Sequence, residues 1–130
     1  MTKEQIVKIS ASLPLPAGSY WLVMGAALVM HGIRQETRDI DIGCTHDAFD
    51  FLLTSGHQIS TSRSGLRKVA LDSHISVYDG FFTKKILWID GIPVSDLESI
   101  RTIKSFFGRE KDLSDIKLID QHLARMNQND

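Results

Sequence analysis

Hydrophobic and polar positions in the first third of the chain follow the order helix, strand, helix. Apolar residues three or four positions apart predict an amphipathic helix over residues 2–13, which the two prolines that follow would end. Residues 20–24 form a short apolar run that is typical of a buried strand. The aliphatic residues 26–31 favour a second helix, and a glycine follows them as a stop. The strand and the second helix would therefore meet in a tight turn at Gly25.

The middle of the chain predicts further strands around one helix. Residues 38–43 alternate charged and apolar side chains, as a strand with one polar face does. Residues 47–55 have an apolar face at helical spacing, and Gly56 would end that helix. Short apolar runs separated by turn residues predict later strands that pair as antiparallel hairpins, at residues 58–62, 66–71, 75–78, 86–89 and 92–94.

Two helices are predicted to close the chain. Ser95 and Glu98 have the spacing of a capping box, and the apolar positions after them predict a helix that ends at Gly108. A last helix follows over residues 112–126. Without an internal repeat or a linker, the whole pattern predicts one domain over residues 1–130. Its fold class would be α/β (α+β), with a mixed sheet flanked by helices and with C-terminal helices.

Two carboxylates in the predicted strand are the strongest candidates for chemistry. Asp39 and Asp41 are two residues apart, so they would lie side by side on one sheet face. Adjacent carboxylates repel each other unless a cation lies between them, and Mg²⁺ prefers oxygen ligands of this kind. An isolated pair is more often part of a solvated edge strand. Here, however, the Gly25 turn allows close approach of a ligand, and the helix start after it favours a phosphate, so we predict a site for a metal-bound triphosphate.

Three short runs carry a resemblance to a known family. They are VMGAAL at residues 23–28, HGIR at residues 31–34 and TRDIDI at residues 37–42, which give a glycine turn followed by two acidic residues flanked by apolar ones. A C-terminal stretch over residues 93–116 fits the same pattern. Together these runs resemble the signature of the polymerase-β-type nucleotidyltransferase superfamily, especially its small bacterial members. The resemblance extends over nearly the whole chain.

This resemblance implies a fold, a reaction and a cofactor. The protein would transfer a nucleotidyl group from a nucleoside triphosphate, such as ATP, to an acceptor hydroxyl. Gly25 and Ala26 would contact the β- and γ-phosphates, and Asp39 and Asp41 would be catalytic residues that hold Mg²⁺. Ala26 stands where the family usually has glycine or serine, which removes a hydroxyl but leaves the backbone donors in place.

A third carboxylate is common in the family, on a later strand beside the first two. Ser76 occupies the position that fits best here, so we predict Asp79 as the third catalytic residue, with Asp72 and His74 as alternatives. Without such a group the acceptor hydroxyl loses its activation, and activity would be slow or absent. The alternative prediction is therefore a catalytically degenerate domain that binds a nucleotide or a protein partner, for example in a toxin–antitoxin pair.

Basic residues offer further contacts for phosphates. Arg34 and Arg38 flank the predicted phosphate region and are predicted to bind the nucleotide. Lys104 is also predicted to do so, with a solvated helix face as the equally weighted alternative. For Arg109 we favour a structural role, in which it pairs with a nearby aspartate and fixes the turn between the last two helices.

Composition and charge narrow the function further. The 130 residues have 15 basic and 16 acidic side chains and a net charge of −1, which is unlike a protein that binds duplex nucleic acid through bulk charge. One cysteine excludes an internal disulfide, and the apolar stretch over residues 20–30 is too short to span a bilayer. We therefore expect a cytoplasmic protein. So small a domain leaves the acceptor unidentified, and a homodimer, a partner protein or an open groove would have to provide its binding surface.

Overall fold

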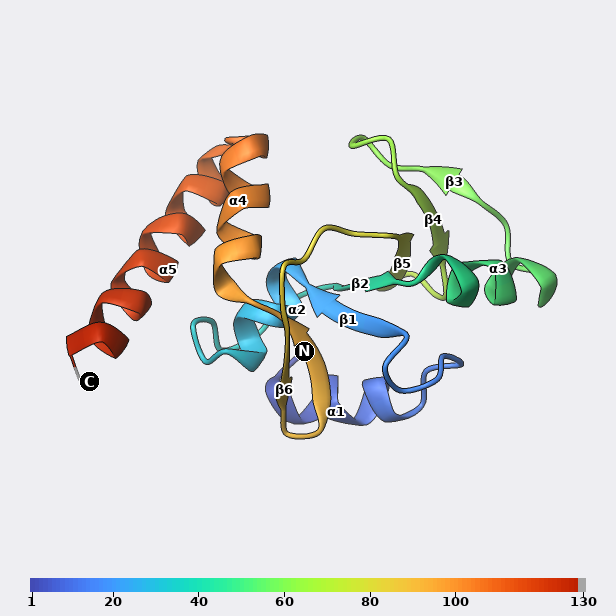
Figure 1. Ribbon diagram of the computed structural model, residues 1–130, viewed down its shortest axis with the longest axis horizontal. Coiled ribbons are helices and arrows are strands. Elements are labelled where there is room, and N and C mark those ends of the chain that lie inside the picture. The colour runs from blue at the N-terminus through green and yellow to red at the C-terminus, as the bar shows by residue number, and fades with distance from the viewer. Residues whose placement is uncertain (129–130) are drawn as a thin grey trace.

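Five helices and seven strands follow one another in the computed structural model, which describes residues 1–128 (Figure 1). The helices are α1 (Lys3–Ala11), α2 (Met24–Met30), α3 (His46–Thr54), α4 (Leu97–Phe107) and α5 (Glu110–Gln128). The strands are β1 (Tyr20–Val23), β2 (Ile40–Cys44), β3 (Ser60–Thr61), β4 (Arg67–Ala70), β5 (Ile75–Asp79), β6 (Ile86–Ile89) and β7 (Ile92–Ser95). This order confirms the predicted fold class, and the predicted elements all form with shifts at their ends.

All the strands named above belong to one mixed sheet in the order β3-β4-β5-β2-β1-β7-β6. The predicted hairpins form, since β4 pairs antiparallel with β3 and β5, and β6 pairs antiparallel with β7. The prediction was incomplete for two strands, because β5 also pairs parallel with β2 and β7 pairs parallel with β1. β2 lies in the middle of the sheet, because it pairs antiparallel with β1 on one side and parallel with β5 on the other.

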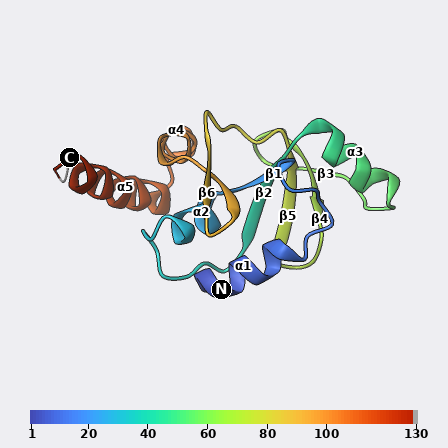
Figure 2. The ribbon, with the colours of Figure 1, turned by 60° about the horizontal axis from the view of Figure 1, so that its bottom comes forward.

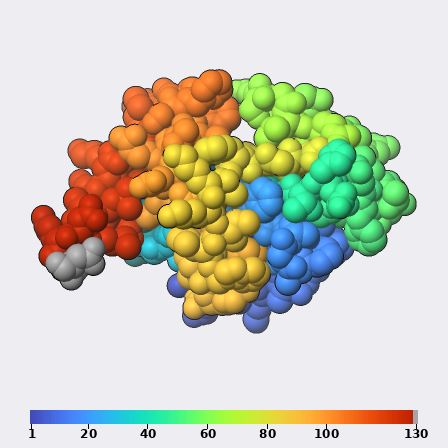
Figure 3. Space-filling view, viewed as in Figure 1, coloured from blue at the N-terminus to red at the C-terminus, as the bar shows by residue number. Residues whose placement is uncertain are grey.

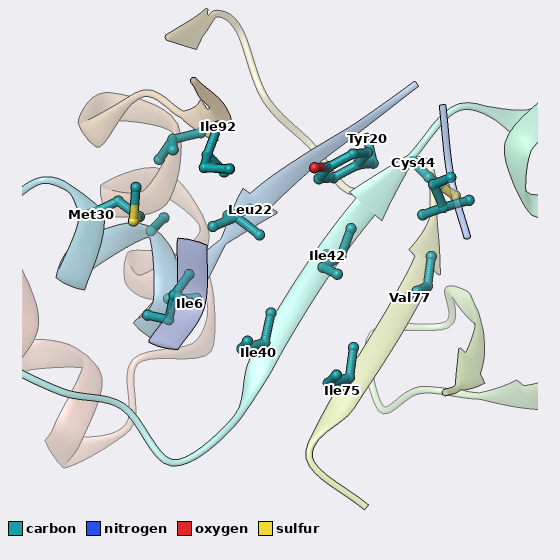
Figure 4. Close-up of a cluster of buried hydrophobic side chains, with 14 of the residues drawn as sticks. Ile6, Tyr20, Leu22, Met30, Ile40, Ile42, Cys44, Ile75, Val77 and Ile92 are labelled. Atoms are coloured by element: carbon teal, nitrogen blue, oxygen red, sulfur yellow. The ribbon is translucent and has the colours of Figure 1, made fainter. Parts of the chain in front are cut away.

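Alternation along β2 and β5 divides the sheet into two faces with different roles. Ile40, Ile42 and Cys44 point to the same side as Ile75 and Val77, and all five are buried (Figure 4). Side chains from α1, α2 and α3 complete this main hydrophobic core, and Figure 2 shows α1 and α2 lying across one side of the sheet. The intervening residues of both strands point to the opposite face, where the polar candidates lie.

The start of α4 differs from its prediction. Ser95 is the last residue of β7, where it pairs with Ile86, and its hydroxyl group hydrogen-bonds with the Thr83 hydroxyl at 2.8 Å and does not cap the helix. Asp96 caps α4 instead, and its side chain accepts a hydrogen bond from the backbone N–H of Ser99 at 3.2 Å. The predicted stop at Gly108 is confirmed, because this residue has the left-handed conformation at the end of α4.

The last two helices extend to one side of the sheet, and α4 packs against α5 (Figures 1 and 2). The hairpin of β3 and β4 rises at the other end of the sheet (Figure 1). None of the helices within residues 1–128 combines the length and the apolar character needed to cross a membrane.

Candidate active site

Asp39 and Asp41 lie at the start of the central strand, on the face opposite the main core. Asp41 is the second residue of β2 and is half-buried, whereas Asp39 precedes the strand and its side chain is 52% exposed. Buried isoleucines on both sides of Asp41 fix its direction, because neighbouring strand residues must point to opposite faces. The structure therefore brings together the two carboxylates predicted from the sequence, and they line one cavity.

The electrostatics of this pair are unfavourable without a cation. Burial raises the pKa of the Asp41 carboxyl, and the negative charge of Asp39 raises it further. The Tyr78 hydroxyl donates a long hydrogen bond of 3.4 Å to Asp41 Oδ1, which acts in the opposite direction. Burial and the charge of Asp41 in turn raise the pKa of Tyr78 to about 12, so the phenol keeps its proton at neutral pH. A cation near these carboxylates would relieve their repulsion.

The cavity that contains the two carboxylates has a volume of about 520 Å³. Arg34 and Arg38 line it from the segment between α2 and β2, and Lys111 lines it from α5. Within the described residues 1–128, none of these three cations has a carboxylate within 4.0 Å. Their charges are therefore available to an anion, and the placement of both arginines agrees with the sequence prediction.

Gly25 lies in the wall of this cavity, where a side chain would not fit. A Cβ atom at Gly25 would lie 2.6 Å from Thr37 Oγ1 and 3.6 Å from an Arg34 guanidinium nitrogen. The Thr37 hydroxyl in turn donates a hydrogen bond of 3.1 Å to the backbone oxygen of Asp39. Glycine thus allows the loop that carries the acidic pair to pack closely on α2. Ala26 is fully buried in the main core and is not among the residues that line the cavity, so the structure does not place it where the sequence predicted a phosphate contact.

We predict that Gly25→Ala weakens the binding of magnesium ATP by about tenfold, because the added methyl group displaces Thr37 and, through it, Asp39. Isothermal titration calorimetry with ATP and Mg²⁺ measures this effect. Gly91→Ala is the control for a general loss of stability, because Gly91 lies on the β6–β7 turn, outside the cavity, where its left-handed backbone (φ 77°) makes an added Cβ costly although no other atom lies within 4 Å of it. Unchanged affinity in Gly25→Ala would mean that the loop can move aside without cost.

Asp79 does not join the acidic pair, which corrects the sequence prediction. It is three residues after Ser76 on β5, so the two side chains point to opposite faces of the sheet. Asp79 Oδ2 instead accepts a hydrogen bond of 2.6 Å from Arg67 and lies 3.3 Å from His46 Nδ1. The residue directly opposite Asp41 on β5 is Ser76. The strand position beside Asp41 therefore carries a hydroxyl group and no third carboxylate.

The two alternatives to Asp79 have different positions. His74 Nδ1 lies 3.1 Å from Asp39 Oδ1, so this imidazole is next to the acidic pair. Asp72 Oδ1 accepts hydrogen bonds from the backbone N–H groups of His74 and Ile75, which uses its carboxylate in the turn before β5. Of the two, only His74 is placed to contribute to the site.

Lys104 lines the cavity, but its ammonium group already has partners. Its Nζ atom lies 2.8 Å from Asp115 Oδ2 and 3.5 Å from Asp112 Oδ1, and its side chain is 5% exposed. The predicted nucleotide contact is thus replaced by ion pairs between α4 and α5. Arg109 also pairs with Asp112, through its Nε and Nη2 atoms, in agreement with its predicted structural role.

Sequence reasoning missed Lys68, which lies on the same sheet face as Asp41, two strands away on β4. Lys68 is opposite Tyr78 in the antiparallel pairing of β4 and β5, and its charge lowers the pKa of Asp41. The pattern held a signal for it, because Tyr78 is two residues from Ser76 and so shares its face. The partner of Tyr78 on β4 depends on the hairpin register, which the sequence does not determine.

The carboxylate oxygens of Asp39 and Asp41 are ligands of the kind that Mg²⁺ binds. The described residues contain no group of three or more His, Cys, Asp or Glu side chains placed to hold a metal ion. Asp39 and Asp41 supply carboxylate oxygens, and burial together with the charge of Asp39 raises the pKa of Asp41 despite the opposing charges of Lys68 and Lys111. Mg²⁺ in nucleotide sites uses one or two carboxylates and completes its coordination with water and substrate phosphates. Two carboxylates beside unpaired arginines therefore fit a magnesium ion that arrives with a phosphate ligand.

Comparisons with known proteins identify the fold. No model of a known protein family and no curated protein matches the sequence. The structure is similar to that of the lincosamide antibiotic adenylyltransferase LnuA bound to lincomycin, with a TM-score of 0.57 and 15% identity over 90% of this chain and 93% of that chain. It is also similar to a candidate nucleotidyltransferase of Thermotoga maritima, with a TM-score of 0.53 and 12% identity over 88% and 87% of the two chains.

The chain has the nucleotidyltransferase fold. The resemblance seen in the sequence is thus confirmed at the level of the fold, over most of the chain. In this nucleotidyltransferase fold the acidic pair begins the central strand, and the sheet face that carries it is bordered by α5 and by the loop after α2.

Proposed function

We propose that this protein transfers a nucleotidyl group from a nucleoside triphosphate to an acceptor hydroxyl, with Mg²⁺ as its cofactor. The observation that supports this function is that one cavity is lined both by two carboxylates and by two arginines. Asp39 and Asp41 supply negative charge for a cation, and Arg34 and Arg38 supply positive charge for phosphates. Neither group alone would hold magnesium triphosphate, whereas together they match its two kinds of charge. LnuA is described as an adenylyltransferase, so ATP is the first donor to test.

In this proposal the residues bind and orient the donor. Arg34 and Arg38 bind the β- and γ-phosphate oxygens and stabilise the pyrophosphate as it leaves, and Gly25 allows Thr37 and Arg34 to pack closely against α2 in the wall of the cavity. Asp39 and Asp41 hold Mg²⁺, which supplies positive charge to the triphosphate when bound. His74 Nδ1, 3.1 Å from Asp39 Oδ1, orients that carboxylate. A cytoplasmic location, where nucleoside triphosphates are abundant, stays a prediction.

Thermal unfolding in the presence of Mg²⁺, ATP, or both tests the proposal. Both together are expected to raise Tm by about 10 °C at a ligand concentration of 100 Kd, since such binding contributes about 2.7 kcal/mol. Arg34→Ala/Arg38→Ala should lose most of this rise, and Arg125→Ala, on the exposed end of α5, should keep it. A rise in Tm no larger than that with Mg²⁺ alone or ATP alone would argue against a donor site.

Ser76 supports a second candidate function, a catalytically degenerate domain that binds a nucleotide or a protein partner. Its hydroxyl lies where the family commonly has the third carboxylate, directly opposite Asp41. ATP labelled at the α-phosphate distinguishes the two functions. Label transfer to any acceptor supports the enzyme, and stable magnesium ATP binding without transfer or pyrophosphate release supports the binding domain.

A further inference from the structure

A second cavity adjoins the proposed donor site on the other side of Asp41. Its volume is about 410 Å³, and it lies between the loop joining β3 and β4 and the end of α4. Figure 1 shows the hairpin loop and α4 rising on opposite sides of this space, and Figure 3 shows a notch between them at the upper edge of the molecule. Met24, Asp41, Arg109 and Lys111 line both cavities, so the two spaces are contiguous.

The charges in this second cavity are mostly positive. Arg63 lies on the hairpin loop, Lys68 on β4 and Lys111 on α5. Within residues 1–128, none of the three has a carboxylate within 4.0 Å. Asp41 is the only acidic residue that lines the cavity in this described part of the chain. A ligand that fills the cavity must therefore bring negative charge to these cations.

Aromatic side chains provide the apolar part of the same cavity. The rings of Tyr78 and Phe81 pack edge to face, with their centroids 5.5 Å apart. Phe107 lines the cavity at the end of α4, with the Arg109 guanidinium 5.2 Å from the centre of its ring. Aromatic rings beside cationic groups are the combination that binds flat bases joined to phosphates.

The direction of nucleotidyl transfer assigns a role to this second cavity. The acceptor oxygen bonds to the α-phosphorus as the bond to the bridging pyrophosphate oxygen breaks. Pyrophosphate leaves with that electron pair, and the hydroxyl proton passes to water. The attacking and leaving oxygens lie roughly in line. With pyrophosphate beside Arg34 and Arg38, the acceptor enters from the far side of Asp41, where the second cavity lies.

We propose that the second cavity binds the acceptor, and that this acceptor is a phosphate-bearing compound with a flat ring, namely a nucleotide, either free or at the end of an RNA strand. The inference rests on the proposed function for the role of acceptor. The positive charges of the cavity exclude polycationic acceptors such as aminoglycosides, because Arg63, Lys68 and Lys111 would repel the protonated amines of such an acceptor.

Binding of three probes, measured by isothermal titration calorimetry in Mg²⁺, tests the proposal without a need for catalysis. The probes are uridine, uridine 5′-monophosphate and triuridylate. The two phosphate-bearing probes are expected to bind about tenfold more tightly than uridine. Arg63→Ala/Lys68→Ala should reduce this affinity by about tenfold or more, because it removes two charged partners from the cavity. Equal affinity for the monophosphate and triuridylate would indicate a free nucleotide, and tighter binding of triuridylate would indicate an RNA end.

Two matched pairs of substitutions locate the binding. Arg125→Ala/Lys117→Ala, on exposed positions of α5, removes the same charges elsewhere and should leave probe affinity unchanged. Arg34→Ala/Arg38→Ala should weaken ATP and spare the probes. Equal affinity for uridine and its monophosphate, or probe binding that depends on Arg34 and Arg38 alone, would overturn the inference. Weaker ATP binding in Arg63→Ala/Lys68→Ala would also overturn it, by assigning the cavity to the donor base.

The same measurements separate this inference from the proposed function. If Mg²⁺ and ATP fail to stabilise the protein, the donor site is wrong, and the acceptor role is lost with it. Phosphate-dependent probe binding that requires Arg63 and Lys68 would still establish the second cavity as a nucleotide site. If ATP binds and the probes do not, the donor site stands and the acceptor inference is rejected.

Discussion

Replacing Asp41 with Asn is expected to reduce magnesium-dependent nucleotidyl transfer by at least about 100-fold and, at the same time, to raise the Tm of the ligand-free protein. The first effect follows from the loss of one of the two carboxylates in the cavity. The second follows because Asp41 is half-buried beside Asp39, and an amide removes both the desolvated charge and the repulsion. Opposite effects on activity and stability are typical of functional residues.

The gain in stability should depend on pH in a defined direction. Burial and the charge of Asp39 raise the pKa of Asp41 in the folded state. A carboxyl with a raised folded-state pKa contributes stability at acid pH, and this contribution is lost as pH rises through that pKa. The difference in Tm between Asp41→Asn and the natural protein should therefore be smallest at acid pH and grow toward neutral pH.

Thermal unfolding of both proteins across this pH range measures the difference. Asp47→Asn is the matched control, because Asp47 is exposed on the first turn of α3 and has no ion pair among the described residues. An increase in Tm that does not depend on pH, or a decrease in Tm in Asp41→Asn, would contradict the conclusion that burial and the charge of Asp39 destabilise the Asp41 carboxylate. Transfer activity that survives the substitution would exclude Asp41 from the chemistry.

The acidic pair could be predicted because it depends on local sequence alone. Asp39 and Asp41 are two residues apart in a run of alternating charged and apolar side chains, and alternation along a strand fixes their shared side. The same rule would have excluded Asp79, since an odd spacing from Ser76 places it on the opposite face. The sequence prediction chose Asp79 because it is the carboxylate nearest to the end of the strand. In the structure, the face to which a side chain points decides whether it can reach Asp41, and Asp79 points to the other face.

Contacts between residues far apart in the sequence could not be predicted from local patterns of apolar and polar residues. The pairing of Lys68 with Tyr78 requires the register of β4 on β5, and the parallel pairing of β5 with β2 brings Ser76 beside Asp41 although the two residues are far apart in the sequence. Both depend on how the whole sheet assembles. The ion pairs of Lys104 could not be predicted for a related reason, because its partners lie on α5, beyond the turn at Gly108.

Replacing Asp112 with Ala is expected to destabilise the protein by about 3–5 kcal/mol, as measured by urea unfolding. The Asp112 side chain is fully buried and lies 3.5 Å from the Lys104 ammonium, whose own side chain is 5% exposed. Asp112 also accepts hydrogen bonds from the Arg109 side chain and from its backbone N–H at the start of α5. The substitution would leave a buried cation with Asp115 as its remaining partner, and it would remove the connection that orders the turn between α4 and α5.

The exposed ion pair between the same two helices provides the control. Arg101 and Asp120 have exposed fractions of 44% and 48%, so Asp120→Ala should destabilise the protein much less than Asp112→Ala does. Lys104→Met/Asp112→Asn should recover part of the stability lost in Asp112→Ala, because it removes the buried cation together with its partner.

Acid pH should reproduce part of the effect of Asp112→Ala in the natural protein. Burial pushes the pKa of Asp112 upward, but hydrogen bonds from Arg109 and the charge of Lys104 outweigh it, so this pKa lies below its ordinary value. A lowered folded-state pKa gives stability that is present above the ordinary carboxyl range and is lost as pH falls through the folded pKa. Stability should therefore decrease in acid, and less steeply in Asp112→Ala. If Asp112→Ala and Asp120→Ala cost the same, the buried pairs would contribute no more than surface pairs, and Lys104 would again be a candidate for phosphate binding.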